Sequence, residues 1–158
     1  MGNRAVVTVS GSKVGVYLHW NGGPESVRAF LRAAKDLGVR DPESDPSYFY
    51  ARFAQIVGNF FGGTTSVGVG ALEELDTDNG DNGVFVIGAG FKITRREHAK
   101  YAAHDVKGKP ARDKENAVYL ATMAANRELL AESDYQANGT RTATVSYIPE
   151  DAGAPTAA

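Results

Sequence analysis

Apolar and polar residues alternate at the start of the chain in the way that is typical of β-strands. Residues 4–10 (RAVVTVS) and 14–20 (VGVYLHW) are rich in β-branched and aromatic side chains, and residues 11–13 (GSK) separate them. Two such runs joined by a short segment that contains glycine predict an N-terminal β-hairpin. Both faces of the second run are largely apolar as far as His19, so we expect this strand in the interior of a sheet.

Two helical patterns follow the hairpin. Residues 27–37 carry an apolar stripe at helical spacing, Pro24 suits the first turn before it, and Gly38 suits its end. The second helix is predicted to start at Pro46, behind the capping carboxylate of Asp45, and its apolar stripe ends before a pair of glycines. Because each helix has one apolar stripe, each needs a sheet or another helix to cover it.

Two further strands are expected, near residues 66–69 and over residues 84–94. The second run is interrupted by Gly88-Ala89-Gly90, which indicates a bulge or a tight turn. Together with the hairpin, these strands predict a small, mainly antiparallel sheet that is packed by two or three amphipathic helices.

The C-terminal third has weaker signals. They suggest a short helix around residues 98–104, a third helix over residues 113–131 and a last strand over residues 141–148. Residues 149–158 have little apolar surface and are expected to form a flexible tail. We therefore predict an α+β fold with a single domain over residues 1–148.

Composition limits the classes of function. Of the 158 residues, 42% are apolar and 23% charged, the net charge is −2, and there is no cysteine. Disulfides, zinc ribbons and thiol catalysis are therefore excluded, and no field strong enough to collect nucleic acid over a broad face is expected. The opening residues contain only a short apolar run, which predicts neither a signal peptide nor a membrane span, so a cytoplasmic location is expected.

His19, Trp20 and Asn21 stand where a strand ends and a glycine-rich turn leads into a helix. A histidine in this place can act as a general base or a ligand, and the helix N-terminus can bind an anion. The simpler interpretation makes Trp20 a core anchor and His19 a hydrogen-bonded strand residue. In either case His19 and Asn21 are the better candidates to face a pocket.

The segment 75–83 (LDTDNGDNG) concentrates oxygen-bearing side chains. It does not match the spacing of an EF-hand loop, and its Asn-Gly pairs are typical of turns before a strand. We favour a loop over a cation site, although its short polar side chains can still line a pocket. The candidate ligand-binding residues of the chain are thus His19, Trp20, Asn21, Asp78, Asn79, Asp81 and Asn82; no catalytic residue, metal or cofactor is assigned.

Four segments in combination resemble a family of small uncharacterised proteins carried by bacteriophages and integrative mobile elements. They are GNRAVV (2–7), VGVYLHWNGG (14–23), GNFFGG (58–63) and LDTDNGDNGV (75–84), and the resemblance extends over about residues 2–95. It implies an accessory protein that works in the cytoplasm of a bacterial host. It brings no catalytic residues with it.

Three hypotheses for the function remain. The first is a non-enzymatic binding module that engages a host protein or a small ligand, with counter-defence as one role; membrane and nucleic-acid partners are not expected. The second is a metal-assisted hydrolase or phosphoryl-transfer enzyme, with His19 as base or ligand and with Asp76, Asp78 and Asp81 holding a divalent cation. The third is a virion or assembly component. The oligomeric state stays open.

Overall fold

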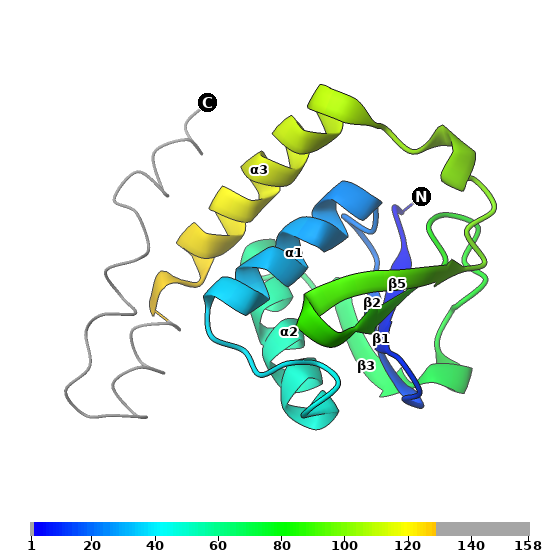
Figure 1. Cartoon of the computed structure of the whole chain (residues 1–158), viewed down its shortest axis with the longest axis horizontal. Helices are drawn as coiled ribbons and strands as arrows, with labels where there is room; N and C mark the ends of the chain where they lie inside the picture. Colours follow the sequence, from blue (N-terminus) through cyan, green and yellow to red (C-terminus); the bar gives the residue numbers. More distant parts are fainter. Residues whose placement is uncertain (1, 129–158) are drawn as a thin grey trace.

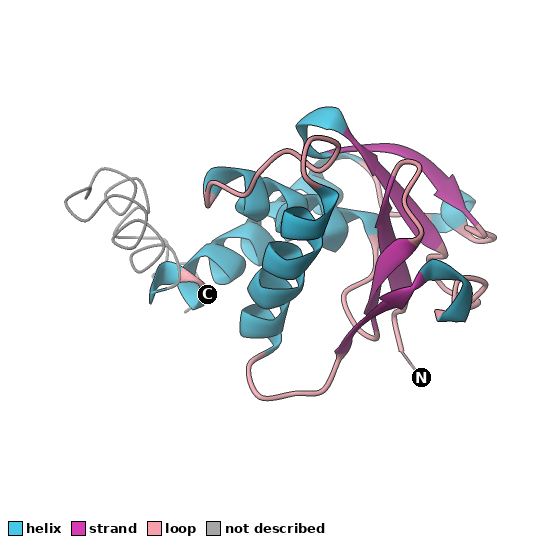
Figure 2. Cartoon of the chain, turned by 90° about the horizontal axis from the view of Figure 1, so that it is seen from below, coloured by secondary structure: helices cyan, strands magenta, loops and turns pink. Residues whose placement is uncertain are grey.

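The computed structural model of the chain describes residues 2–128. These residues form a five-stranded sheet with helices packed on one of its faces, as Figures 1 and 2 show. The predicted α+β class is therefore confirmed. The predicted last strand, the tail and the end of the predicted domain lie outside the described residues.

The sheet has the strand order β3-β2-β1-β4-β5. Its neighbours are antiparallel except for β1 and β4, which are parallel, so the sheet is mainly antiparallel as predicted. The N-terminal hairpin supplies β1 and β2, and β2 lies in the interior, between β3 and β1. The strands are β1 (Ala5–Val9), β2 (Val14–Leu18), β3 (Val67–Ala71), β4 (Val84–Gly88) and β5 (Lys92–Glu97).

The predicted strand over residues 84–94 is divided by a tight turn into β4 and β5. Gly90 has a φ of 72° and Phe91 a φ of 63°, a backbone region in which glycine is comfortable and phenylalanine is not. Two carboxylates from the loop after the first helix hold this turn. Asp41 accepts a hydrogen bond from the Gly90 backbone N–H at 2.6 Å, and Glu43 accepts one from Ala89 at 2.7 Å.

The helices α1 (Pro24–Asp36) and α2 (Pro46–Phe61) begin where the sequence predicts. Asp45 caps α2, because its carboxylate accepts a hydrogen bond from the Tyr48 backbone N–H at 3.2 Å. Gly38 follows α1 with a φ of 83°, as expected for a glycine that ends a helix. Local capping signals therefore set these helix ends.

The helix α3 (Gly108–Ala125) begins five residues before the predicted start at Asp113. Apart from the buried Ala111, its first turns are mostly polar and exposed, so they carry no apolar periodicity that would reveal them in the sequence. The helix packs chiefly against α1 and α2. Before it, the expected short helix around residues 98–104 is reduced to a single 3₁₀ turn at Ala102–His104.

The main core lies between the sheet and the helices. Val7, Val16 and Leu18 meet Phe30 of α1 and Phe53 of α2, and all five are buried. The opposite face of the sheet carries a smaller apolar cluster, which the 3₁₀ turn Leu72–Glu74 helps to cover. Its buried members are Val6, Val84 and Val86, with Tyr17, Leu72 and Leu75 against them.

Candidate functional site

His19 continues the pairing of β2 with both neighbouring segments. Its backbone N–H donates to Ser66 at 3.0 Å, and its carbonyl oxygen accepts from Asn3 at 2.9 Å. Its ring Nδ1 lies 2.9 Å from the Tyr17 hydroxyl, two residues back on the same face of the strand. The predicted role of His19 as a hydrogen-bonded residue at the end of a strand agrees with these contacts.

The interpretation of Trp20 as a core anchor is wrong, because its side chain is 45% exposed. The position next to the N-terminal segment is taken by Gly22, where a Cβ would lie only 2.5 Å from the Asn3 carbonyl oxygen. Asn21, with a φ of 54°, makes the turn between them. The indole therefore stays at the surface, with its ring edge-to-face against His19 at a centroid distance of 5.1 Å.

A hollow of about 640 Å³ opens at the end of β2. Two of its walls come from the turn after β2 and from the segment between α2 and β3. It is lined by His19, Trp20, Asn21, Phe61, Thr64, Thr65 and Ser66. Residues 75–83 form the acidic loop, and none of its four candidate residues lines this hollow, so the structure does not join the seven candidate residues in one pocket.

The acidic loop is organised around Asn79, which is only 3% exposed. The Asn79 amide donates to the backbone carbonyls of Asp76, Thr77 and Gly83, and its oxygen accepts from the backbone N–H groups of Asp81 and Gly83. A side chain that meets so many backbone groups of its own loop acts as a structural centre. The loop interpretation accounts for this contact pattern.

The carboxylates of this loop face cations of the chain itself. Arg4 contacts Asp81 at 2.7 Å and Asp76 at 3.5 Å, and Lys100 contacts Asp78 at 3.1 Å. Partial burial disfavours the charged form of Asp81, but hydrogen bonds from Arg4 outweigh this effect and lower the pKa of the carboxyl.

His19 approaches Arg4 rather than a shared metal site. A Cβ built on Gly2 would lie 3.1 Å from Arg4 Cγ and 3.2 Å from His19 Cε1, so both side chains border Gly2, and His19 is also near enough to Asp81 to help lower the pKa of its carboxyl. Among residues 2–128, no group of three or more histidine, aspartate and glutamate side chains is placed to hold a metal ion. Asn82, the last candidate, donates from its amide to the Asn3 side chain and to the Arg4 carbonyl.

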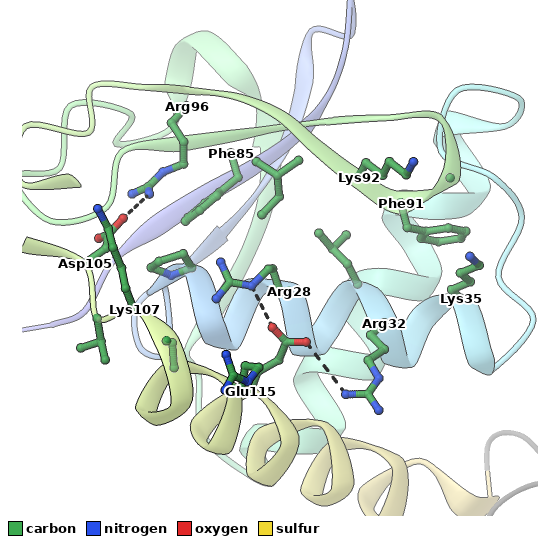
Figure 3. Close-up of a pocket in the computed structure, with 18 residues that line it drawn as sticks. Arg28, Arg32, Lys35, Phe85, Phe91, Lys92, Arg96, Asp105, Lys107 and Glu115 are labelled. Atoms are coloured by element: carbon green, nitrogen blue, oxygen red, sulfur yellow. Dashed lines mark hydrogen bonds and ion pairs between the residues drawn. The ribbon is translucent and has the colours of Figure 1, made fainter. Parts of the chain in front are cut away.

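A second, cationic groove of about 900 Å³ lies between α1, α3 and the β4–β5 hairpin (Figure 3). Its floor is apolar and its walls are charged. The apolar members are Pro24, Leu31, Phe85, Phe91, Ile93, Val106 and Ala111. Two carboxylates, Asp105 and Glu115, face seven cations in this cationic groove: Arg28, Arg32, Lys35, Lys92, Arg96, Lys107 and Arg112.

Three of the arginines are held by the protein itself. Arg28 contacts Glu115 at 2.8 Å, and Arg32 stacks over an α3 tyrosine with 3.9 Å to the ring centroid. Arg96 lies over the Phe85 ring at 4.2 Å and contacts Asp105 at 3.0 Å, while its buried Nε has no hydrogen-bond partner. These arginines therefore have defined positions in the walls.

The other four cations of the cationic groove make no ion pair with any described residue. They are exposed and come from three different elements or their flanks: Lys35, Lys92, Lys107 and Arg112. The whole chain carries a net charge of −2, so the positive charge of these four side chains is a property of the cationic groove and not of the protein as a whole. An anionic group entering the cationic groove would meet them directly.

Sequence reasoning missed the cationic groove because its cations are distant along the chain. One signal was present: Arg28, Arg32 and Lys35 have the spacing i, i+4 and i+7, which places them on one face of a helix. Nothing in the sequence indicated that β5 and the start of α3 would add four more cations to that face.

Comparisons with known proteins add no relative. A scan against models of protein families finds no match, and neither a curated protein nor a solved structure matches the chain. Of the helices in residues 2–128, none combines the length and apolar character that crossing a membrane requires.

Proposed function

We propose that the protein is a non-enzymatic binding module that holds an anionic group of a host protein or of a small molecule in the cationic groove. The observation that carries this proposal is the gathering of seven cations against two carboxylates in one concave surface of an acidic protein. Converging positive charge in a concave site raises the local concentration of anions and strengthens their hydrogen bonds.

The chemistry of the lining supports binding rather than catalysis. The cationic groove has no histidine, serine, threonine or tyrosine among its lining residues. Its two carboxylates, Asp105 and Glu115, are both paired with arginines, at 3.0 and 2.8 Å. A carboxylate that acts as a general base or nucleophile is normally unpaired, and a lysine does so when it is desolvated, whereas Lys35, Lys92 and Lys107 are exposed. The fixed arginines and the apolar floor instead suit recognition.

The metal-assisted hydrolase hypothesis draws no support from the acidic loop, because Arg4 and Lys100 occupy its carboxylates. The proposed setting is the cytoplasm of a bacterial host, in which a phage or mobile-element accessory protein engages a host component. Its support is the resemblance of the four N-terminal segments, which contribute to β1, β2, the end of α2 and the loop before β4 but contain none of the residues that line the cationic groove.

An anion titration with matched variants tests the proposal. Isothermal titration calorimetry with sodium triphosphate and with poly-glutamate should show binding that weakens as salt is added. Arg112→Gln should lower the affinity by about three- to fivefold, the effect of one partly exposed charge. Arg52→Gln removes the same charge from α2, outside the cationic groove, and should leave the affinity unchanged.

Two outcomes would contradict the proposal. One is the absence of anion binding at low salt. The other is an equal loss of affinity for Arg112→Gln and Arg52→Gln, which would mean that the overall charge of the protein, and not the cationic groove, attracts the anion.

A further inference from the structure

We infer that the occupant of the cationic groove is an extended acidic segment of a partner protein, which adds a strand to the outer edge of β5, an edge that no strand of residues 2–128 pairs with. This inference rests on the proposed anion-binding function and specifies its ligand. It combines three features of the structure: an edge strand, an apolar floor beside it, and cations at both ends of that floor.

The strand β5 is the end of the described sheet and has β4 as its single neighbour. Among residues 2–128, no strand pairs with the backbone N–H and C=O groups along its outer side, so these groups can receive another strand. Its six residues span about 20 Å, enough for a segment of similar length. Extended peptides commonly bind in this way, with backbone hydrogen bonds for affinity and side-chain pockets for specificity.

The charge of β5 decides which kind of strand fits. Lys92, Arg95 and Arg96 give the strand KITRRE a positive balance. Glu97 pairs with Arg95 at 2.7 Å, and Lys92 is left without an ion pair among the described residues. A second copy of β5 would place cations against cations, which is a common protection of edge strands against self-association. An acidic strand would place opposite charges against each other, so the edge discriminates in favour of it.

The cationic groove has an apolar floor between two cationic ends. Figure 3 places Lys35 and Lys92 with Phe91 at one end, and Arg96 and Lys107 with Asp105 at the other. The apolar lining residues that keep exposed surface beside these cations are Phe91, Ile93 and Val106. Because side chains of a strand alternate between two faces, a bound strand would direct every second side chain at this floor. Apolar residues in the middle and acidic residues towards the ends match it.

The start of α3 adds to the cationic end at Lys107. Gly108 lines the cationic groove, the helix has no side-chain cap, and its first turn contains no acidic residue. Its first backbone N–H groups and the positive end of its dipole therefore favour a carboxylate supplied from outside. This feature reinforces the cationic cluster and does not act alone.

Nucleic acid fits the same charge less well. A single strand needs cations at regular intervals and aromatic faces on which bases stack. The Phe85 ring is fully buried beneath Arg96, and Asp105 and Glu115 interrupt the row of cations. A phosphate-bearing ligand is therefore kept as an outcome of the test.

The test uses fluorescence anisotropy with the full chain and a library of labelled eight-residue peptides. Each peptide carries valine, leucine or isoleucine at its central positions and acidic residues towards both ends, and a matched library carries lysine in place of the acidic residues. The best acidic peptide is then made in two N-methylated forms, each blocking the amides along one edge. Triphosphate and a single-stranded DNA octamer serve as phosphate-bearing competitors.

We expect acidic peptides to bind at least tenfold more tightly than their lysine counterparts. One N-methylated form should lose about tenfold in affinity and the other should not, because a strand pairs along one edge. Lys92→Glu and Lys107→Glu should each weaken binding by about fivefold or more. Arg52→Glu, the same reversal outside the cationic groove, should leave it unchanged.

Other results separate this inference from the proposed function. If no acidic peptide binds better than its lysine counterpart, or if both N-methylated forms bind like the parent, the strand-addition inference is wrong. If triphosphate or the DNA octamer still binds and Arg112→Gln weakens it, the anion-binding function stands without the inference. If no anion binds at all, both fail.

Discussion

Replacing Asn79 by alanine is the sharpest test of how the acidic loop is built. The substitution removes the acceptor for the Asp81 and Gly83 backbone N–H groups, at 3.0 and 3.1 Å, together with the donor to three carbonyls. Each buried N–H left without a partner costs about 1–3 kcal/mol, and solvent can reach the Asp81 side of the loop. We therefore expect a loss of about 2–4 kcal/mol in the free energy of unfolding.

The assay is urea denaturation followed by far-UV circular dichroism, with Asp78→Ala as the matched control from the same loop. The Asp78 carboxylate is 52% exposed, and its contact with Lys100 at 3.1 Å lies at the surface. Such a pair contributes little, so the control should change stability by about 0.5 kcal/mol or less. For a domain of this size, Asn79→Ala should also lower the melting temperature by about 5–15 °C.

Two results would refute this reasoning. The first is a loss for Asn79→Ala that is no larger than that for Asp78→Ala, which would mean that the amide network does not stabilise the loop. The second is a stabilisation of the native protein by millimolar Ca²⁺ or Mg²⁺ that Asp78→Ala abolishes, which would restore the cation-site interpretation.

Contacts elsewhere in the fold lead to three more expectations. Arg4 lowers the pKa of Asp81 despite the partial burial of that carboxyl. The ion pair therefore stabilises the folded protein above about pH 4, and this stabilisation is lost as the pH falls further. Asp81→Asn should flatten the fall in the free energy of unfolding towards acid pH. Burial, with a hydrogen bond to an α1 aspartate, raises the pKa of Tyr119 to about 12. The stabilisation of the fold by the protonated phenol is therefore complete below about pH 10 and is lost as the pH rises towards 12. Tyr119→Phe should remove one late-ionising phenol from an ultraviolet titration. Gly22→Ala would bring a Cβ to 2.5 Å from a backbone oxygen and should destabilise the folded protein by about 1–3 kcal/mol. Gly58→Ala in α2, where a Cβ would have no atom within 4 Å, should stabilise it by about 0.5–1 kcal/mol. The reverse order of the two urea midpoints would contradict both expectations.

The parts of the fold that follow from short-range contacts were predictable. Asp45 and Pro46 marked the start of α2 because a capping carboxylate and a proline act within one turn of helix. Gly38 marked the end of α1 for a similar reason, since the turn after it needs a positive φ. The hairpin and the amphipathic helices followed from alternation and helical spacing, which depend on neighbours a few residues away.

The candidate sites were predicted only in part. His19, Trp20 and Asn21 do line a hollow, but the exposure of Trp20 depends on Gly22 lying close to Asn3, nineteen positions away in the sequence, and no local pattern reports that contact. In the acidic loop, turn-forming composition correctly favoured a loop. Its pairing with Arg4 became visible only when β1 and β4 lay side by side.

By itself, then, the sequence determined the fold class, the helices α1 and α2 and the N-terminal hairpin, because caps, turns and periodicity act over a few residues. Only the tertiary structure decided the parallel pairing of β1 with β4, the turn that makes β5 an edge strand, and the cationic groove. The cationic groove joins segments from α1, β5 and the start of α3, and its Arg28 and Glu115 are 87 positions apart in the sequence. The net charge of −2 averages the cations of the cationic groove with the carboxylates of the rest of the chain, so it does not reveal them. They form a site only when packing brings them to one surface.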